Sequence, residues 1–189
     1  MESLIPLLSK AYKQIGHDVV FLPHPSNRSL SHLEDGILDA EIARLSVVEK
    51  KIGNIVRINI PIHTLKGFAY TNRGEIEEYT PEILGHYRLT SLRGVLWSDR
   101  VVTNHPRSNQ MTQPADLLRL LQEGRTDIIF LAEETMDRLL ENHPATSVKI
   151  RKLYPAIAIQ PMYHYIHKKH RDLVPELEKA ISDLLKNRK

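Results

Sequence analysis

The chain has 189 residues, of which 41% are apolar and 26% charged, a composition that permits one large domain or two small lobes and excludes a low-complexity protein. It contains no cysteine, which excludes structural disulfides, catalytic thiolates and cysteine-based zinc sites but fits cytosol and periplasm equally. The net charge is +3 and only 6% of the residues are aromatic, whereas nucleic-acid surfaces interleave basic residues with aromatic ones. We therefore expect no nucleic-acid partner.

The N-terminal stretch predicts a helix. Glu2 stands where a signal peptide carries positive charge, and the apolar residues that follow recur at helical spacing. No apolar run approaches the roughly 18 residues that a membrane-spanning helix needs. We expect an amphipathic helix from about residue 3 to residue 15, no signal peptide in this chain, and no membrane span.

The rest of the chain alternates apolar runs with helical patterns, bounded by Gly, Pro or Asn. In the first half we expect a strand over residues 19–22, a helix over 30–35, and strands over 38–42, 55–60 and 68–70. In the second half we expect a strand over 95–97, a helix that begins at Pro114 and ends at Gly124, a strand over 128–131, a helix over 133–141, a strand over 156–159 and a final helix that carries residues 177–185.

One pattern occurs twice in the chain. It consists of two leucines three apart, an acid, a glycine and, three residues later, an aspartate. The first copy is Leu30, Leu33, Asp35, Gly36 and Asp39, and the second is Leu118, Leu121, Glu123, Gly124 and Asp127. Each copy is typical of a helix that ends at a left-handed glycine and leads into a strand. Two copies predict two similar lobes.

Alternating strands and helices favour parallel pairing through right-handed crossovers. We expect an α/β fold of two lobes, each a small, mostly parallel sheet flanked by helices. Lobe one is expected to comprise residues 1–70 and 155–189, and lobe two residues 71–154. The two crossings between the lobes are expected near residues 70–74 and 153–155.

Three stretches resemble the extracellular solute-binding proteins of family 3, the amino-acid-type receptors of ABC importers: residues 36–44, 91–95 and 123–128. Residues 163–170 are similar to the return strand and final helix of divergent members. The resemblance implies the type II periplasmic-binding fold, a small polar solute held between two lobes, an ABC permease as partner and a periplasmic location. The same short motifs also resemble LysR-type effector domains. A ligand-sensing module of a regulator or receptor, or a truncated receptor that binds nothing, are the alternatives.

In that family a first strand precedes the helix that starts here near residue 3. The resemblance therefore implies that lobe one lacks one strand of its sheet or completes the sheet differently. An exposed central edge invites pairing with another chain, because its unpaired backbone groups need partners. We expect dimerisation or strand exchange through that edge.

Family members grip a ligand carboxylate with a Thr and an Arg beyond the Asp of the first lobe. Val48 and Lys51 stand at those positions here, and lysine supplies charge without the bidentate fork of arginine. Arg44 is the better candidate, because it follows the expected strand 38–42 and ligands of open α/β sheets bind beyond the carboxyl ends of strands. A salt bridge is the alternative role for Arg44.

For the second lobe the resemblance implies an acid that meets the ligand ammonium group. Ala132 holds that position, and Glu133 or Glu134 could substitute, although both also suit the first turn of a helix. The loop after the expected strand 95–97 should face the cleft. Further ligand-binding candidates are therefore Ser98, Thr103 and Asn104, with Tyr70 and Trp97 as apolar walls. Core packing is the alternative for Trp97.

Metal and enzyme functions are disfavoured. His164, His167 and His170 would share a face of a helix, but their neighbours favour a strand, which would separate the rings, and no acidic ligand lies nearby. The chain has no GxGxxG, phosphate-loop or HExxH motif and no recognisable nucleophile motif. We expect a binding protein without metal or cofactor rather than an enzyme.

Overall fold

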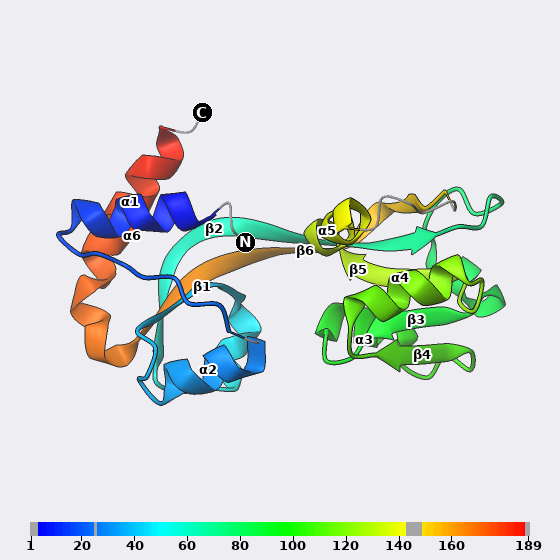
Figure 1. The fold of residues 1–189 in the computed structure, drawn as a ribbon, viewed down its shortest axis with the longest axis horizontal. Coiled ribbons are helices and arrows are strands. Elements are labelled where there is room, and N and C mark those ends of the chain that lie inside the picture. Colours follow the sequence, from blue (N-terminus) through cyan, green and yellow to red (C-terminus); the bar gives the residue numbers. More distant parts are fainter. Residues whose placement is uncertain (1–3, 25, 143–148, 188–189) are drawn as a thin grey trace. The chain divides into compact units, whose positions relative to one another are not determined.

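The structure, a computed structural model, describes residues 4–24, 26–142 and 149–187 (Figure 1). The chain forms two compact units: unit 1 is Met1–Thr64 with Gln160–Lys189, and unit 2 is Leu65–Ile159. The chain passes between them within two strands, β2 (Ile55–Thr71) and β6 (Arg151–His167). The division falls earlier in β2 and later in β6 than the expected crossings. No helix of the described ranges is long and apolar enough to span a membrane.

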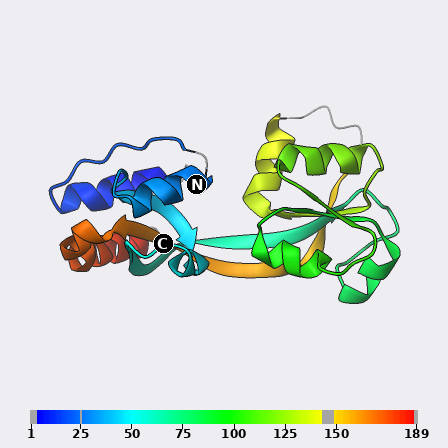
Figure 2. The same cartoon turned by 90° about the horizontal axis from the view of Figure 1, so that it is seen from below.

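Unit 1 packs helices against both faces of its strands. Its own elements are α1 (Ile5–Gln14), α2 (Ser26–Glu34), β1 (Ala40–Leu45), the 3₁₀ helices η2 (Ser46–Lys50) and η4 (Lys168–Leu173), and α6 (Val174–Lys186). The expected N-terminal helix is confirmed as α1, which lies beside α6 (Figures 1 and 2). On β6, Ile166 belongs to the core under α1 and α6, whereas Tyr165 packs with Leu33 of α2 and Val48 of η2. This alternation is that of a strand buried on both faces.

Unit 2 is a sheet between two helical layers. Its elements are the 3₁₀ helix η3 (Pro81–His86), β3 (Leu89–Leu92), α3 (Leu96–Val102), β4 (Ser108–Met111), α4 (Pro114–Gln122), β5 (Ile128–Ala132) and α5 (Glu133–Asn142). On β5, Ile128 and Phe130 face the core that contains Trp97 of α3, while Ile129 and Leu131 face the core under α4 and α5. The expected strand over 128–131 is confirmed, and helices cover both of its faces (Figure 2).

The strand order is β1-β6-β2-β5-β3-β4. Strand β3 pairs in parallel with β4 and β5, as expected, whereas β1 with β6 and β2 with β5 are antiparallel. The expectation of mostly parallel sheets is therefore corrected. Parallel pairing needs a crossover connection, and β2 and β6 are instead long continuous strands shared by both units. The α/β class is confirmed.

The repeated pattern has the expected local structure. Gly36 follows α2 with a φ of +69°, and Gly124 follows α4 with a φ of +65°. Positive φ is the conformation that glycine adopts without steric cost at a helix end. The two copies then lead into β1 and β5.

Two expected strands are wrong. Val95 is the N-cap of α3 and residues 96–97 begin that helix, because Gly94, with a φ of +82°, ends the turn after β3. Residues 19–22 form no ladder with any strand of the described residues. Their side chains alternate nevertheless: Val19 and Phe21 pack on the core, while Val20 is 83% and Leu22 60% exposed. The segment is therefore extended but unpaired.

Candidate functional site

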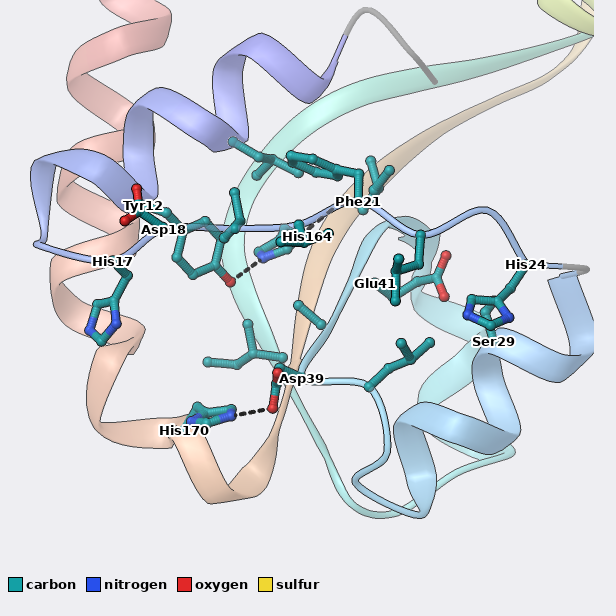
Figure 3. Close-up of a pocket in the computed structure, with 18 of the residues that line it drawn as sticks. Tyr12, His17, Asp18, Phe21, His24, Ser29, Asp39, Glu41, His164 and His170 are labelled. Carbon is teal, nitrogen blue, oxygen red and sulfur yellow. Dashed lines mark hydrogen bonds and ion pairs between the residues drawn. The ribbon is translucent and has the colours of Figure 1, made fainter.

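A cavity of about 620 Å³ lies within unit 1 (Figure 3). The unpaired segment 17–24 bounds it on one side, and residues 37–42, which lead into and include part of β1, bound it on another. Leu8 and Tyr12 of α1, with His164 and Ile166 of β6, also line the cavity. The volume falls within the range that ligand pockets occupy.

A neutral hydrogen-bonded pair stands inside this cavity. The Tyr12 hydroxyl lies 2.8 Å from His164 Nε2, and His164 Nδ1 lies 3.2 Å from the carbonyl oxygen of Ile42. Because a carbonyl can only accept, Nδ1 carries the proton, and Nε2 of the neutral ring accepts from Tyr12. Burial lowers the pKa of His164 to about 4 and raises the pKa of Tyr12. The pair is therefore uncharged at neutral pH and joins α1 to β6.

Charged side chains gather where residues 37–42 meet the cavity. Asp39 Oδ1 lies 2.8 Å from both Lys169 Nζ and His170 Nε2. Hydrogen bonds, first from Lys169 and then from His170, lower the pKa of Asp39. Glu41 also lines the cavity, and its carboxylate lies 3.0 Å from Arg44 Nη2. The β1 side of the cavity therefore carries two carboxylates.

The two ligand-binding candidates of unit 1, Arg44 and Lys51, are not among the residues that line the cavity. Arg44 donates from Nη2 to Ser29 Oγ at 2.8 Å in addition to its ion pair with Glu41. Its guanidinium therefore joins β1 to α2. Lys51 is exposed in the turn that follows η2. A ligand role for either residue stays a prediction.

Two candidates of unit 2, Glu133 and Tyr70, lie close to an ion pair that packs against aromatic rings. Glu133 begins α5, and its Oε1 lies 2.5 Å from Lys152 Nζ of β6. The Lys152 ammonium in turn lies 5.0 Å from the ring centre of Phe68 and 5.8 Å from that of Tyr154. The hydrogen bond from Lys152 lowers the pKa of Glu133. We refer to Glu133, Lys152, Phe68, Tyr154 and Tyr70 as the aromatic ion-pair cluster.

Tyr70 contributes a hydroxyl that has no hydrogen-bond partner among the described residues and is buried. Its ring stacks edge to face with Phe68, with centroids 6.4 Å apart. Burial, and then the charges of Asp137 and Glu133, raise the pKa of Tyr70, so the hydroxyl stays protonated. Buried polar groups nearly always have a hydrogen-bond partner. The Tyr70 hydroxyl can therefore donate a hydrogen bond to a bound ligand.

The other candidates of unit 2 occupy structural positions on α3 or just after it. Trp97 is buried against Gly67, and a Cβ built on that glycine would lie 2.7 Å from the indole ring. Ser98 is buried and donates to the carbonyl of Val95 at 3.1 Å. Thr103 donates to the carbonyl of Asp99, and Asn104 follows in a left-handed conformation with a φ of +64°. Thr103 and Asn104 are exposed.

The sequence alone did not single out Lys152, Phe68 or Tyr154. These residues belong to β2 and β6, which are distant in sequence and become neighbours only in the sheet. No local pattern could have brought them together with Glu133. A weak signal existed in the aromatic residues that alternate with other residues along both strands.

The three histidines weighed as metal ligands have separate partners. His164 bonds to Tyr12, His170 pairs with Asp39, and His167 Nδ1 accepts from the backbone N–H of Lys169 at 3.1 Å. Within the described ranges, no group of three or more His, Cys, Asp or Glu is arranged to hold a metal ion.

Several solved structures share this fold. A histidine kinase sensor domain with similarity to periplasmic binding proteins aligns with a TM-score of 0.77 at 18% identity, covering 97% of this chain and 80% of the other. An ancestral arginine-binding protein bound to arginine gives 0.75 at 15% identity, covering 97% and 81%. AbpA of Streptococcus pneumoniae, an amino acid ABC transporter substrate-binding protein bound to L-arginine, gives 0.73 at 16%, covering 98% and 78%.

In sequence, an uncharacterized protein of Shewanella oneidensis is 24% identical over 190 residues, which cover 97% of this chain and 69% of that protein. No family model matches the chain. At these identities the comparisons show the fold, which is the two-lobed periplasmic-binding-protein-like fold. Membership of solute-binding family 3 stays a prediction.

Proposed function

We propose that this chain binds a small polar solute, an amino acid or a related organic ion, as the substrate-binding component of an ABC importer. The aromatic ion-pair cluster is the observation that carries this proposal. It combines a carboxylate, an ammonium group, aromatic faces and a buried hydroxyl donor on one side of unit 2. A mostly apolar surface with a few oriented polar groups is typical of small-molecule sites.

Four members of the cluster match charged groups of an amino acid. The Glu133 carboxylate can accept from a ligand ammonium group, and the faces of Phe68 and Tyr154 already surround the ammonium of Lys152 at cation–π distance. Lys152 can pair with a ligand carboxylate instead of Glu133. The side chains of Glu133 and Lys152 are 29% and 27% exposed, so a solute can reach both.

The fold supports the same class of ligand. Solved neighbours bind arginine, and one is a transporter component. An ABC permease as partner and a periplasmic location follow from that likeness and from the family resemblance. Binding rather than catalysis also fits these neighbours.

Thermal denaturation in the presence of a panel of amino acids and organic ions tests the proposal. A ligand should raise the melting temperature of the wild-type chain, because anything that binds only the folded state stabilises it. Glu133→Gln should lose this rise. Glu123→Gln is the matched control, because Glu123 forms a surface ion pair with Arg119 on α4 and has no part in the cluster. An equal rise in both variants would contradict the assignment of the site.

The alternative function is a ligand-sensing module, which the likeness to a histidine kinase sensor domain supports. Both functions need the same ligand site and differ in what the bound form does next. Uptake of the labelled solute by the native host, with and without the gene, separates them. Loss of uptake supports an importer component, and unchanged uptake with altered transcription supports a sensor.

A further inference from the structure

The residues that line the cavity of unit 1 could accept an additional β-strand. Strand β1 stands at the end of the strand order, so one of its edges has no strand partner among the described residues. That side of unit 1 holds the cavity, with residues 37–42 along one wall and the unpaired segment 17–24 along another (Figure 3). Leu8 and Tyr12 of α1 contribute the apolar lining that a buried strand needs.

Segment 17–24 itself has the properties of a strand that lacks a neighbour. Its central residues are two valines, a phenylalanine and a leucine, types that favour strands. Val19 and Phe21 pack on the core, whereas Val20 and Leu22 are two of the most exposed large apolar side chains of the described residues. Extended apolar segments with free backbone groups are templates for pairing with another chain.

We propose that two copies of this chain dimerise by reciprocal strand insertion, in which segment 17–24 of each copy enters the cavity of the other. In this arrangement the partner's segment pairs with β1 on one edge and with segment 17–24 of the first copy on the other edge. The two-fold axis lies between the two segments. The resulting strand order is β1 of the first copy, segment 17–24 of the second copy, segment 17–24 of the first copy and β1 of the second copy. In this order each segment has a strand partner on both of its edges.

The arrangement is self-complementary, as a two-fold interface must be. Each copy supplies one acceptor site, and each copy supplies one segment that fills the acceptor site of its partner. Hydrogen-bonding groups also match: the segment carries His17 and His24 at its ends, while the β1 wall carries the carboxylates of Asp39 and Glu41. Imidazole N–H groups can donate to those carboxylates. The interface covers Val20 and Leu22, which the single chain leaves exposed.

The join between α1 and the segment can accommodate the insertion. Gly16 has a φ of +81°, and a Cβ built there would meet no atom within 4 Å. The segment therefore leaves α1 at a left-handed glycine with open space beside its Cα, in a turn where the Gly16 N–H donates to the carbonyl of Lys13. This proposal rests on unit 1 alone and does not depend on the solute site proposed for unit 2.

Disulfide trapping tests the arrangement directly, because the chain has no cysteine of its own. Val20→Cys and Leu22→Cys place single thiols on the two segments that meet at the two-fold axis. Mild oxidation should give a disulfide-linked dimer for at least one of them. Ile159→Cys is the matched control, since Ile159 is 66% exposed but belongs to unit 2, and it should stay monomeric on a denaturing gel.

Light scattering on the unmodified chain gives the second measurement, and a dimer mass is expected. The double variant Val20→Glu/Leu22→Glu should be a monomer with an unchanged circular dichroism spectrum, because both side chains are exposed in the single chain. Val20→Pro should also be a monomer, because proline removes a backbone donor from the ladder. A monomeric wild type, or a dimer that survives both variants, would overturn the proposal.

Discussion

Glu133 Oε1 and Lys152 Nζ lie 2.5 Å apart, and the same ammonium group stands over the rings of Phe68 and Tyr154. An intramolecular cation thus occupies the environment that the proposed function assigns to a ligand ammonium group. The pair links the start of α5 to β6 across the aromatic surface. Removing one member should change which solutes bind, and not only how tightly.

Lys152→Met tests this consequence. The variant keeps an unbranched side chain but releases Glu133 and the aromatic faces from their internal cation. We expect tighter binding of solutes that carry only positive charge and weaker binding of those that carry a carboxylate, each by about tenfold, which corresponds to about 1.4 kcal/mol. Isothermal titration with an amine and with the corresponding amino acid measures both. Parallel changes for the two solutes would contradict the pairing.

Tyr12→Phe should destabilise unit 1. The change removes the hydroxyl that donates to His164 Nε2, and His164 is only 2% exposed, so the acceptor would be buried without its partner. Such a loss costs about 1–3 kcal/mol. Urea unfolding of the wild type and the variant measures the difference. Tyr154→Phe is the control, because the Tyr154 ring is exposed and should lose little stability.

His164 also makes stability dependent on pH. Burial lowers its pKa to about 4 in the folded chain from an ordinary value of 6.5. Between these two values the unfolded chain binds more protons, so stability should be fully present above about pH 6.5 and should fall as the pH drops towards about 4. The total is roughly 3 kcal/mol, at about 1.4 kcal/mol per unit.

Urea unfolding at several pH values checks this slope in the wild type and in His164→Gln, which cannot titrate. The wild type should lose stability across the window, and the variant should lose less. His86→Gln, which changes an exposed histidine, should keep the wild-type slope. Equal slopes for the wild type and His164→Gln would show that His164 is not the titrating group.

Asp127→Asn should destabilise unit 2. Burial raises the pKa of Asp127, but hydrogen bonds from Arg88 and Arg73 outweigh this effect and hold the pKa well below its usual range. The carboxylate is 7% exposed and accepts from both guanidinium groups. Because the arginines themselves are partly exposed, we expect a loss of about 1–3 kcal/mol, measured by chemical unfolding. Asp116→Asn, on the surface of α4, should be nearly neutral.

Gly67→Ala should strain the core beneath α3. The added Cβ would lie 2.7 Å from the Trp97 ring, and overpacking of this kind costs about 1–3 kcal/mol. Trp97 is the single tryptophan of the chain, so its fluorescence reports the displacement directly. Gly74→Ala is the matched control, because a Cβ there meets nothing within 4 Å. An unshifted spectrum and melting temperature for Gly67→Ala would contradict the packing.

Local patterns in the sequence correctly predicted those helices and strands that are determined by residues close together in the chain. The apolar spacing of α1 and α6, and the glycines that follow α2 and α4, depend on neighbours within a few residues, and the structure confirms them. The continuous apolar run of β5 likewise indicates a strand covered on both faces. Such elements can be predicted without knowing how the rest of the chain folds.

The features that escaped prediction depend on distant contacts. Residues 95–97 are too few to distinguish a strand from the start of a helix by their apolar character. Residues 19–22 have strand character, yet a strand requires a partner, and none of the described strands pairs with them. The aromatic ion-pair cluster assembles from β2, β6 and α5, so its members share no sequence neighbourhood.

Native mass spectrometry of the purified chain, in parallel with Glu133→Gln, tests the central claim most directly. The account predicts that the wild type carries or takes up an amino acid or related organic ion, seen as excess mass that disappears on denaturation, and that Glu133→Gln does not. A folded wild-type chain that binds no member of the panel, or a variant that retains the same adduct, would contradict it.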